Sequence, residues 1–189
     1  FEAFLDLSLD VKHADSLQSA LKQFTAPETL SKGNKYRCES CHRLTEAQKK
    51  FSIYSAPQIL TVQLKRFFAN PMTGQPGKLN RPITFPEQFD LAACMSDSEH
   101  GQSTTYKLAG VIVHEGSTCQ SGHYHAFVRA PAGIWYSMND CSVSRVGVES
   151  VFRQRAYILF YERIEAVSEQ NEKKVKTEVS AVASAGVRT

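Results

Sequence analysis

Residues 121–140 read SGHYHAFVRAPAGIWYSMND and contain two runs that are typical of β-strands. His123 stands at the start of the first run, and Asn139 stands at the end of the second. If the two strands meet in a hairpin, these side chains can form the base and the orienting amide of a Cys-His-Asn triad. The chain offers no convincing nucleophile to complete such a triad.

Strand patterns continue on both sides of this hairpin. In residues 59–68 the apolar side chains Leu60, Val62, Leu64 and Phe67 lie among polar neighbours, as in a strand with one buried face. Further strands are expected at 48–54, 106–114, 123–130, 134–138, 142–146 and 156–162, and the alternating residues 1–7 indicate another.

Two helices are expected among these strands. The first follows Asp15 or Ser16, either of which can cap it, and ends before Pro27, which stops the pattern. Its apolar stripe has the helical spacing and consists of Leu17, Ala20, Leu21 and Phe24. The second helix is short, at 148–153.

Composition places the chain among ordinary globular domains, with 189 residues, 42% hydrophobic and 22% charged. No apolar run approaches the ~20 residues of a membrane-spanning helix, and residues 1–7 lack the basic n-region and initiator Met of a signal peptide. Those residues read as a strand without its upstream context, so we expect the chain to begin inside a domain. A net charge of +3 without a basic stripe argues against nucleic acid. We expect neither nucleic acid nor a membrane as a partner.

The chain contains five cysteines, an odd number at irregular spacing. This fits a reducing compartment better than a secreted disulfide scaffold, so we expect an intracellular protein of the cytoplasm, the nucleus or both. Cys38 and Cys41 form a Cys-x-x-Cys, which is half of a tetrahedral zinc site. The other cysteines are remote in sequence, and we expect the missing pair of ligands upstream of Phe1. A redox pair, which would need a βαβ context, and two unrelated thiols are the alternatives.

A second group consists of His114, His123 and His125. On a strand, His123 and His125 point to the same face, so a His-x-His metal site is chemically possible, with Cys119 or His114 as further ligands. No suitably placed carboxylate completes it. We favour a single functional His123, with His114 and His125 as hydrogen-bonded packing residues.

Two neighbours compete to orient His123. Asn139 offers a side-chain oxygen to one imidazole N–H, while Asp140 is charged and adjacent to it. Consecutive strand residues point to opposite faces, so only one of the two can contact His123 directly. The residues alone leave this choice open.

Taken together, these segments closely resemble the C-terminal signature of the ubiquitin-specific proteases, which are papain-like deubiquitinating enzymes. The resemblance spans residues 1–163 and is closest to the branch with Met-Asn-Asp at 138–140. The matching segments are Gly122-His123-Tyr124, Trp135-Tyr136, Asn139-Asp140, 156–161, 60–67, 106–114 and the knuckle Tyr36-x-Cys38-x-x-Cys41.

The resemblance implies an α+β, papain-like cysteine protease fold, of which this chain would be the C-terminal portion, rich in antiparallel strands and with few helices. Fingers are expected at about 1–56, a palm at about 57–163 and a disordered tail at 164–189. Loops 70–80 and 115–122 match the two loops that flank the channel for the ubiquitin tail.

The same resemblance assigns roles to residues. His123 matches the general base, Asn139 the orienting residue and Asp140 a second supporting residue of the site. Cys38 and Cys41 match half of the structural zinc site in the fingers. The implied partners are ubiquitin, ubiquitinated proteins and the N-terminal part of the same catalytic domain.

The sequence departs from the family pattern in one respect. The box that carries the catalytic cysteine, which opens a helix, is absent from residues 1–189, as is the second zinc Cys-x-x-Cys. Neither Cys119 nor Cys141 begins a helix that could lower a thiol pKa. One hypothesis is a deubiquitinating thiol hydrolase whose cysteine lies upstream; the other is a ubiquitin-binding pseudoenzyme. Retention of His123, Asn139 and Asp140 favours the first, and a metal-dependent hydrolase built on the histidines is a distant third.

Overall fold

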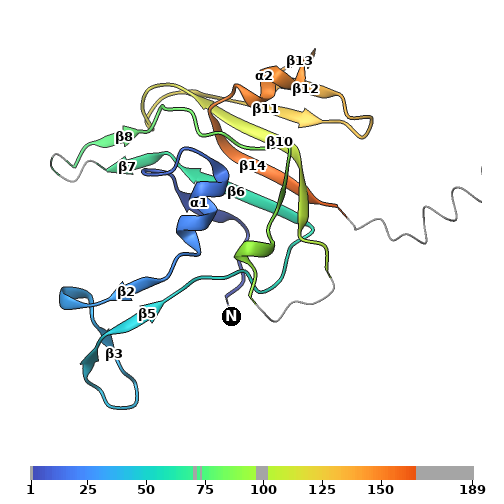
Figure 1. Ribbon diagram of the computed structural model, residues 1–189. Coiled ribbons are helices and arrows are strands. Elements are labelled where there is room, and N and C mark those ends of the chain that lie inside the picture. Colours follow the sequence, from blue (N-terminus) through green and yellow to red (C-terminus); the bar gives the residue numbers. More distant parts are fainter. Residues whose placement is uncertain (1, 70–71, 73, 97–101, 165–189) are drawn as a thin grey trace, which may run out of the picture.

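A mixed eight-stranded sheet forms the centre of the structure, a computed structural model that describes residues 2–69, 72, 74–96 and 102–164 (Figure 1). Its strands lie in the order β1 (Leu7–Asp10), β6 (Ile59–Lys65), β14 (Ala156–Arg163), β10 (Thr105–Glu115), β11 (His123–Arg129), β12 (Trp135–Asn139) and β13 (Ser142–Val146), and β9 (Gln88–Asp90) pairs with β10. The β1–β6 pair is parallel, and the other pairs in the sheet are antiparallel. The expected β-rich fold with few helices is therefore confirmed, with β1 as the parallel exception.

The strands follow the side-chain alternation of the sequence. In β6, Leu60, Val62 and Leu64 are each 0% exposed, because alternate residues of a strand share one face. The same core receives Leu108, Val111 and Leu159 from β10 and β14. This buried face holds the sheet, and with it the ends of β11 and β12, in a fixed position.

Helix α1 (Leu17–Phe24) lies where the sequence predicts a helix, between the candidate cap Ser16 and Pro27. Ser16 is the N-cap, and its hydroxyl accepts a hydrogen bond from the N–H of Ser19 while the Ser19 hydroxyl accepts one from the N–H of Ser16. Leu17, Ala20 and Leu21 are buried, and the helix lies against β1. A second helix, α2 (Val148–Phe152), buries Val151 after β13.

Short hairpins extend from the sheet through residues 28–49 (Figure 1). They pair β2 (Glu28–Leu30) with β5 (Ala47–Lys49) and β3 (Tyr36–Arg37) with β4 (Leu44–Thr45), with a 3₁₀ turn at Lys32–Asn34. The predicted strand at 48–54 is wrong beyond Lys49, because residues 50–54 pair only through a single bridge from Ile53 to Met95. No residue between 22 and 52 is buried.

The predicted strand at 1–7 is also wrong in its position. The strand begins at Leu7, and the preceding Leu5 is 96% exposed, so residues 2–6 have no face to bury. At the opposite end, Ile164 donates its backbone N–H to the carbonyl of Thr105 at 2.8 Å. The rest of the expected tail, residues 165–189, lies outside the described residues.

A separate hairpin follows β6. It consists of β7 (Phe67–Ala69) and β8 (Pro76–Lys78), which pair with each other and not with the central sheet. A 3₁₀ turn at Ala92–Cys94 follows β9. In the part of the chain that is described, no helix has the length and apolar character needed to cross a membrane.

Candidate active site

His123 and Asn139 meet at the edge formed by neighbouring strands β11 and β12. His123 is the first residue of β11 and Asn139 the last of β12, and the strands pair in the register Ala126 to Met138. The imidazole Nε2 of His123 lies 2.5 Å from Oδ1 of Asn139, a short hydrogen bond in which the ring N–H donates to the amide oxygen. The contact expected from the sequence is thus present.

Asp140 lies near the same ring nitrogen but farther away. Its Oδ2 is 3.8 Å from Nε2 of His123, and its side chain is 77% exposed. An ion pair of this length in water contributes little, since solvent screens both charges. Asn139 is therefore the side chain that hydrogen-bonds Nε2, and with the proton on Nε2 the second ring nitrogen, Nδ1, is an acceptor.

The turn after β12 explains why Asn139 and Asp140 lie at different distances from His123. Asn139 pairs with Ser142, so Asp140 and Cys141 form a two-residue connection between β12 and β13. Asp140 has a φ of 49°, a left-handed conformation that aspartate tolerates better than most residues. Because Asp140 lies in the turn, the simple alternation of strand faces does not determine where its carboxylate points.

The other two histidines of the cluster pack around the site. His114 is 5% exposed, with its ring between those of Phe67 and Tyr124 at centroid distances of 5.3 and 4.6 Å. Burial, and then the charge of Lys78, lowers the pKa of His114. His125 lies edge-on to Phe127, and its Nδ1 is 3.9 Å from a carboxylate oxygen of Glu115.

The expectation that His114 and His125 are hydrogen-bonded is wrong for one nitrogen of each ring. Within the described residues, Nδ1 of His114 and Nδ1 of His125 are buried without a hydrogen-bond partner. Aromatic rings pack beside both imidazoles, and a ring edge or face offers Nδ1 no conventional acceptor. The described residues likewise contain no group of three or more histidine, cysteine, aspartate or glutamate side chains arranged to hold a metal ion.

Cys38 and Cys41 lie on the turn of the β3–β4 hairpin. The N–H of Cys38 donates to the carbonyl of Arg43 at 3.0 Å, and the N–H of His42 donates to the carbonyl of Cys38 at 2.8 Å. Backbone N–H groups of Cys41 and then Ser40 hydrogen-bond to the Cys38 sulfur and lower the pKa of its thiol. A lowered pKa favours the thiolate, which is the form that binds zinc. The Cys38 thiol therefore fits half of a tetrahedral zinc site.

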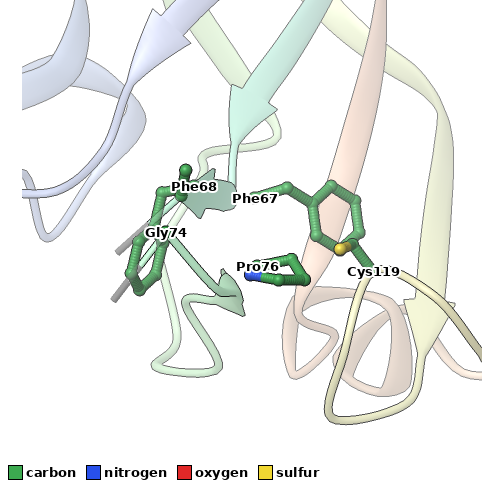
Figure 2. Close-up of a pocket in the computed structure, with 6 residues that line it drawn as sticks. Phe67, Phe68, Gly74, Pro76 and Cys119 are labelled. Atoms are coloured by element: carbon green, nitrogen blue, oxygen red, sulfur yellow. The ribbon is translucent and has the colours of Figure 1, made fainter. Parts of the chain in front are cut away.

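A pocket of about 300 Å³ lies beside the site, between the β7–β8 hairpin and the loop after β10 (Figure 2). Its walls are Phe67, Phe68, Ala69, Gly74, Pro76 and Cys119. Phe67, Phe68 and Ala69 form β7, while Gly74 and Pro76 belong to the loop expected at 70–80 and Cys119 to the loop expected at 115–122. Residues 70, 71 and 73 lie outside the described part. Cys119 lines this pocket with an exposed thiol, and His123 is not among the lining residues.

Sequence reasoning missed two buried or half-buried cations. Arg66 is 1% exposed, and its guanidinium donates to the carbonyls of Ala156, Leu79 and Arg81 at 2.6, 2.9 and 2.8 Å. Burial first, and then the charges of Arg155 and Arg81, lowers its pKa to about 10. The second cation, Lys78, bonds to the loop before His123. In a sequence, a buried arginine or lysine looks the same as a solvent-exposed one. The only signal for Arg66 is that it lies in one of the segments that resemble the family.

Comparisons with known proteins agree with this geometry. The family model described as ubiquitin carboxyl-terminal hydrolase matches residues 3–161. The probable ubiquitin carboxyl-terminal hydrolase 16 of Schizosaccharomyces pombe is 43% identical over 94% of this chain, which spans 37% of that protein. Ubiquitin carboxyl-terminal hydrolase 42 of Homo sapiens is 42% identical over 86% of the chain, which spans 12% of it.

Solved structures show the same relationship. A chain of the SAGA DUB module of Ubp8, Sgf11, Sus1 and Sgf73, bound to monoubiquitin, superposes with a TM-score of 0.76 at 35% identity. The match covers 86% of this chain and 36% of that chain. The chain thus spans well under half of the length of each of these three relatives.

Proposed function

Since the chain belongs to the ubiquitin carboxyl-terminal hydrolase family, we propose that it is the C-terminal portion of a deubiquitinating thiol hydrolase. Such an enzyme cleaves the isopeptide or peptide bond that follows the C-terminal glycine of ubiquitin. The similar SAGA DUB module is described with monoubiquitin bound, which supports ubiquitin as a partner here. Ubiquitinated proteins are then the substrates.

The observation that carries this proposal is the 2.5 Å contact between Nε2 of His123 and Oδ1 of Asn139. This hydrogen bond places the ring proton on Nε2 and leaves Nδ1 as the basic nitrogen. A nucleophilic thiol facing Nδ1 would transfer its proton there and become a thiolate. The imidazolium that forms stays hydrogen-bonded to Asn139, which holds the ring in place through the reaction.

The remaining steps follow from acyl-transfer chemistry. The thiolate attacks the carbonyl carbon of the terminal glycine, and the bond to the departing amine breaks as His123 gives its proton to that nitrogen. A thioester of ubiquitin remains on the cysteine. His123 then takes a proton from water, whose oxygen attacks the thioester and releases the ubiquitin carboxylate and the thiol. Asp140 supports the site from the turn, at the mouth of the loop.

We assign the nucleophile to a cysteine outside these 189 residues. Cys119 lines the neighbouring pocket, and Cys141 lies in the turn after Asn139; neither begins a helix in the described structure. A helix N-terminus is one of the settings that lower a thiol pKa, and neither cysteine has it. The relatives are longer than this chain, so they contain other segments that could supply this cysteine.

The knuckle Cys38/Cys41 is proposed to hold a structural zinc ion together with two ligands from another segment of the longer protein. Its support is the lowered pKa of the Cys38 thiol and the hairpin geometry around it. The five cysteines, all unpaired in the structure, fit a reducing compartment, so we propose an intracellular protein.

The test is hydrolysis of a fluorogenic ubiquitin substrate by the full-length protein. His123→Ala should lower kcat by about 10²- to 10⁴-fold, the range typical of general acid–base catalysis. Cys119→Ser should leave it unchanged, and the 189-residue chain alone should be inactive. Hydrolysis by the isolated chain that Cys119→Ser abolishes would show that the nucleophile has been assigned to the wrong segment.

A pseudoenzyme that binds ubiquitin without cleaving it is the second candidate. The observation that favours it is that His123 has no hydrogen bond to any cysteine in the described structure. If the full-length protein binds ubiquitin, yet releases no fluorophore and carries no cysteine that reacts with a ubiquitin electrophile, the binding module is the correct function.

A further inference from the structure

Lys78 connects the β7–β8 hairpin to the loop that leads into His123. Its ammonium donates hydrogen bonds to the carbonyl of His114 at 2.8 Å and to the carbonyl of Gly116 at 2.6 Å. These two carbonyls flank Glu115, the last residue of β10. Glu115 is the ladder partner of His123, so the contacts of Lys78 lie directly across the strand pair from the proposed base.

The backbone around these carbonyls is tightly packed. A Cβ atom on Gly122 would overlap Nε2 of His114 and the carbonyl oxygen of Glu115. Gly116 has a φ of 134°, and a Cβ there would lie 2.7 Å from the carbonyl oxygen of Ser121. The two ends of the loop therefore touch, and a displacement of Gly116 must move Gly122 and the residue after it, His123.

Apart from these hydrogen bonds, the surroundings of Lys78 disfavour its positive charge. Burial and then the charges of Arg66 and Arg155 lower its pKa, while Glu115 acts in the opposite direction. The ring of Phe67 is 6.0 Å from the ammonium, a weak cation–π distance. Two charge-assisted hydrogen bonds to carbonyl oxygens compensate for the partial burial of the ammonium and its repulsion by the two arginines.

We propose that Lys78 is a positioning residue for the reaction: it clamps the end of β10 and the first residue of the loop, and thereby holds His123 at the distance its thiol partner requires. The inference rests on the function proposed above. Lys78 itself touches neither the substrate nor the reacting atoms. Its effect passes through the His114 and Gly116 carbonyls to the β10–β11 ladder.

The kinetic test uses the full-length protein with Lys78→Met, which keeps the length of the side chain and removes its donors. We expect kcat for a fluorogenic ubiquitin substrate to fall by about 10- to 100-fold, because a displacement of about 1 Å at a reacting group has effects of this size. KM should change by less than about threefold. Lys78→Arg, which keeps the charge and the donors, should recover most of the loss.

Lys65→Met is the matched control, since Lys65 is an exposed lysine at the end of β6. It should leave kcat and KM unchanged. A loss of kcat in Lys78→Met that Lys78→Arg does not recover, or an equal loss in Lys65→Met, would overturn the proposal. Should Lys78→Met fail to fold, Lys78→Leu, which also lacks hydrogen-bond donors, takes its place under the same criteria.

A second readout does not depend on hydrolysis. In the full-length protein, imidazole NMR signals of His123 should report one ring orientation with the proton on Nε2, and in Lys78→Met this signal should shift or broaden. Identical His123 signals in both proteins would overturn the role of Lys78. An inactive wild type with a Lys78-dependent His123 signal would refute the proposed hydrolase and leave the positioning role standing.

Discussion

The central sheet and the short hairpins of residues 28–49 belong to one chain but are held together differently. The sheet buries Leu60, Val62, Leu64 and their neighbours at 0% exposure, while residues 22–52 include none that is buried. Hairpins of two or three residues per strand cannot form a stable core alone. Leu44 of β4 is 65% exposed, while Leu30 and Ala47 are half-buried.

The difference shows where each kind of function can reside. His123 and Asn139 need a fixed separation, and they are located on strands that the core immobilises. The Cys38/Cys41 hairpin has no such support, and the proposed zinc ion would supply stability that an absent core cannot. The stability of the sheet should therefore change little when Cys38 and Cys41 are replaced. The hairpins of residues 28–49 should change little in stability when one of their exposed apolar residues is replaced.

The largest expected effect concerns the zinc ion. In the full-length protein, Cys38→Ser combined with Cys41→Ser should abolish tight binding of one zinc, since apparent binding energies for complete sites reach about 10–16 kcal/mol. Elemental analysis measures this directly. The 189-residue chain, with two thiolates only, should bind zinc weakly. Stoichiometric zinc that survives the double substitution would exclude the knuckle as a ligand.

A smaller effect separates the two regions by their apolar residues. Leu64→Ala, at a 0% exposed site in β6, should lower the free energy of unfolding by about 2–5 kcal/mol. Leu44→Ala, in the exposed β4, should change it by less than about 0.5 kcal/mol. Urea denaturation of the 189-residue chain, followed by the fluorescence of the buried Trp135, measures both. Equal losses of unfolding free energy from the two substitutions would contradict the proposed difference between the buried sheet and the exposed hairpins.

The same difference determined what could be predicted from the sequence. Alternating apolar residues identified β6, β10, β11, β12 and β14, and the bounds predicted for β13 were those of the structure. The β3 and β4 strands have two residues each, too few to show any period, and they were not predicted. The strand expected at 48–54 ended early because its residues have no neighbouring strand to pair with beyond Lys49.

The site was predictable to a similar degree. Two strand ends placed His123 beside Asn139, but the rule of alternating faces could not place Asp140, which adopts a left-handed turn. Lys78 gave no signal, since its partners are backbone carbonyls 36 and 38 residues away in the chain. Contacts of this kind depend on the tertiary fold rather than on residue type.

The smallest expected effect is a pH dependence from His114. Burial lowers its pKa in the folded state below the ordinary value of 6.5, so the unfolded state binds more protons as pH falls below that value. The folded state should thus lose stability between pH 7 and the lowered pKa. His114→Gln should reduce this loss by at most a few °C in Tm, whereas the exposed His13→Gln should not. Thermal denaturation at several pH values tests it, and an unchanged pH profile in His114→Gln would refute it.

The central claim is that Asn139, and not the charged Asp140, orients the imidazole of His123. Its most direct test is the kcat and KM of full-length Asn139→Ala and Asp140→Ala with a fluorogenic ubiquitin substrate. Asn139→Ala should lower kcat by about 10²-fold or more with little change in KM, because the ring loses its 2.5 Å partner. Asn139→Asp should be tolerated, and Asp140→Ala should have the smaller effect. Near-normal activity in Asn139→Ala, together with a loss of several orders of magnitude in Asp140→Ala, would contradict the claim and exchange the two roles.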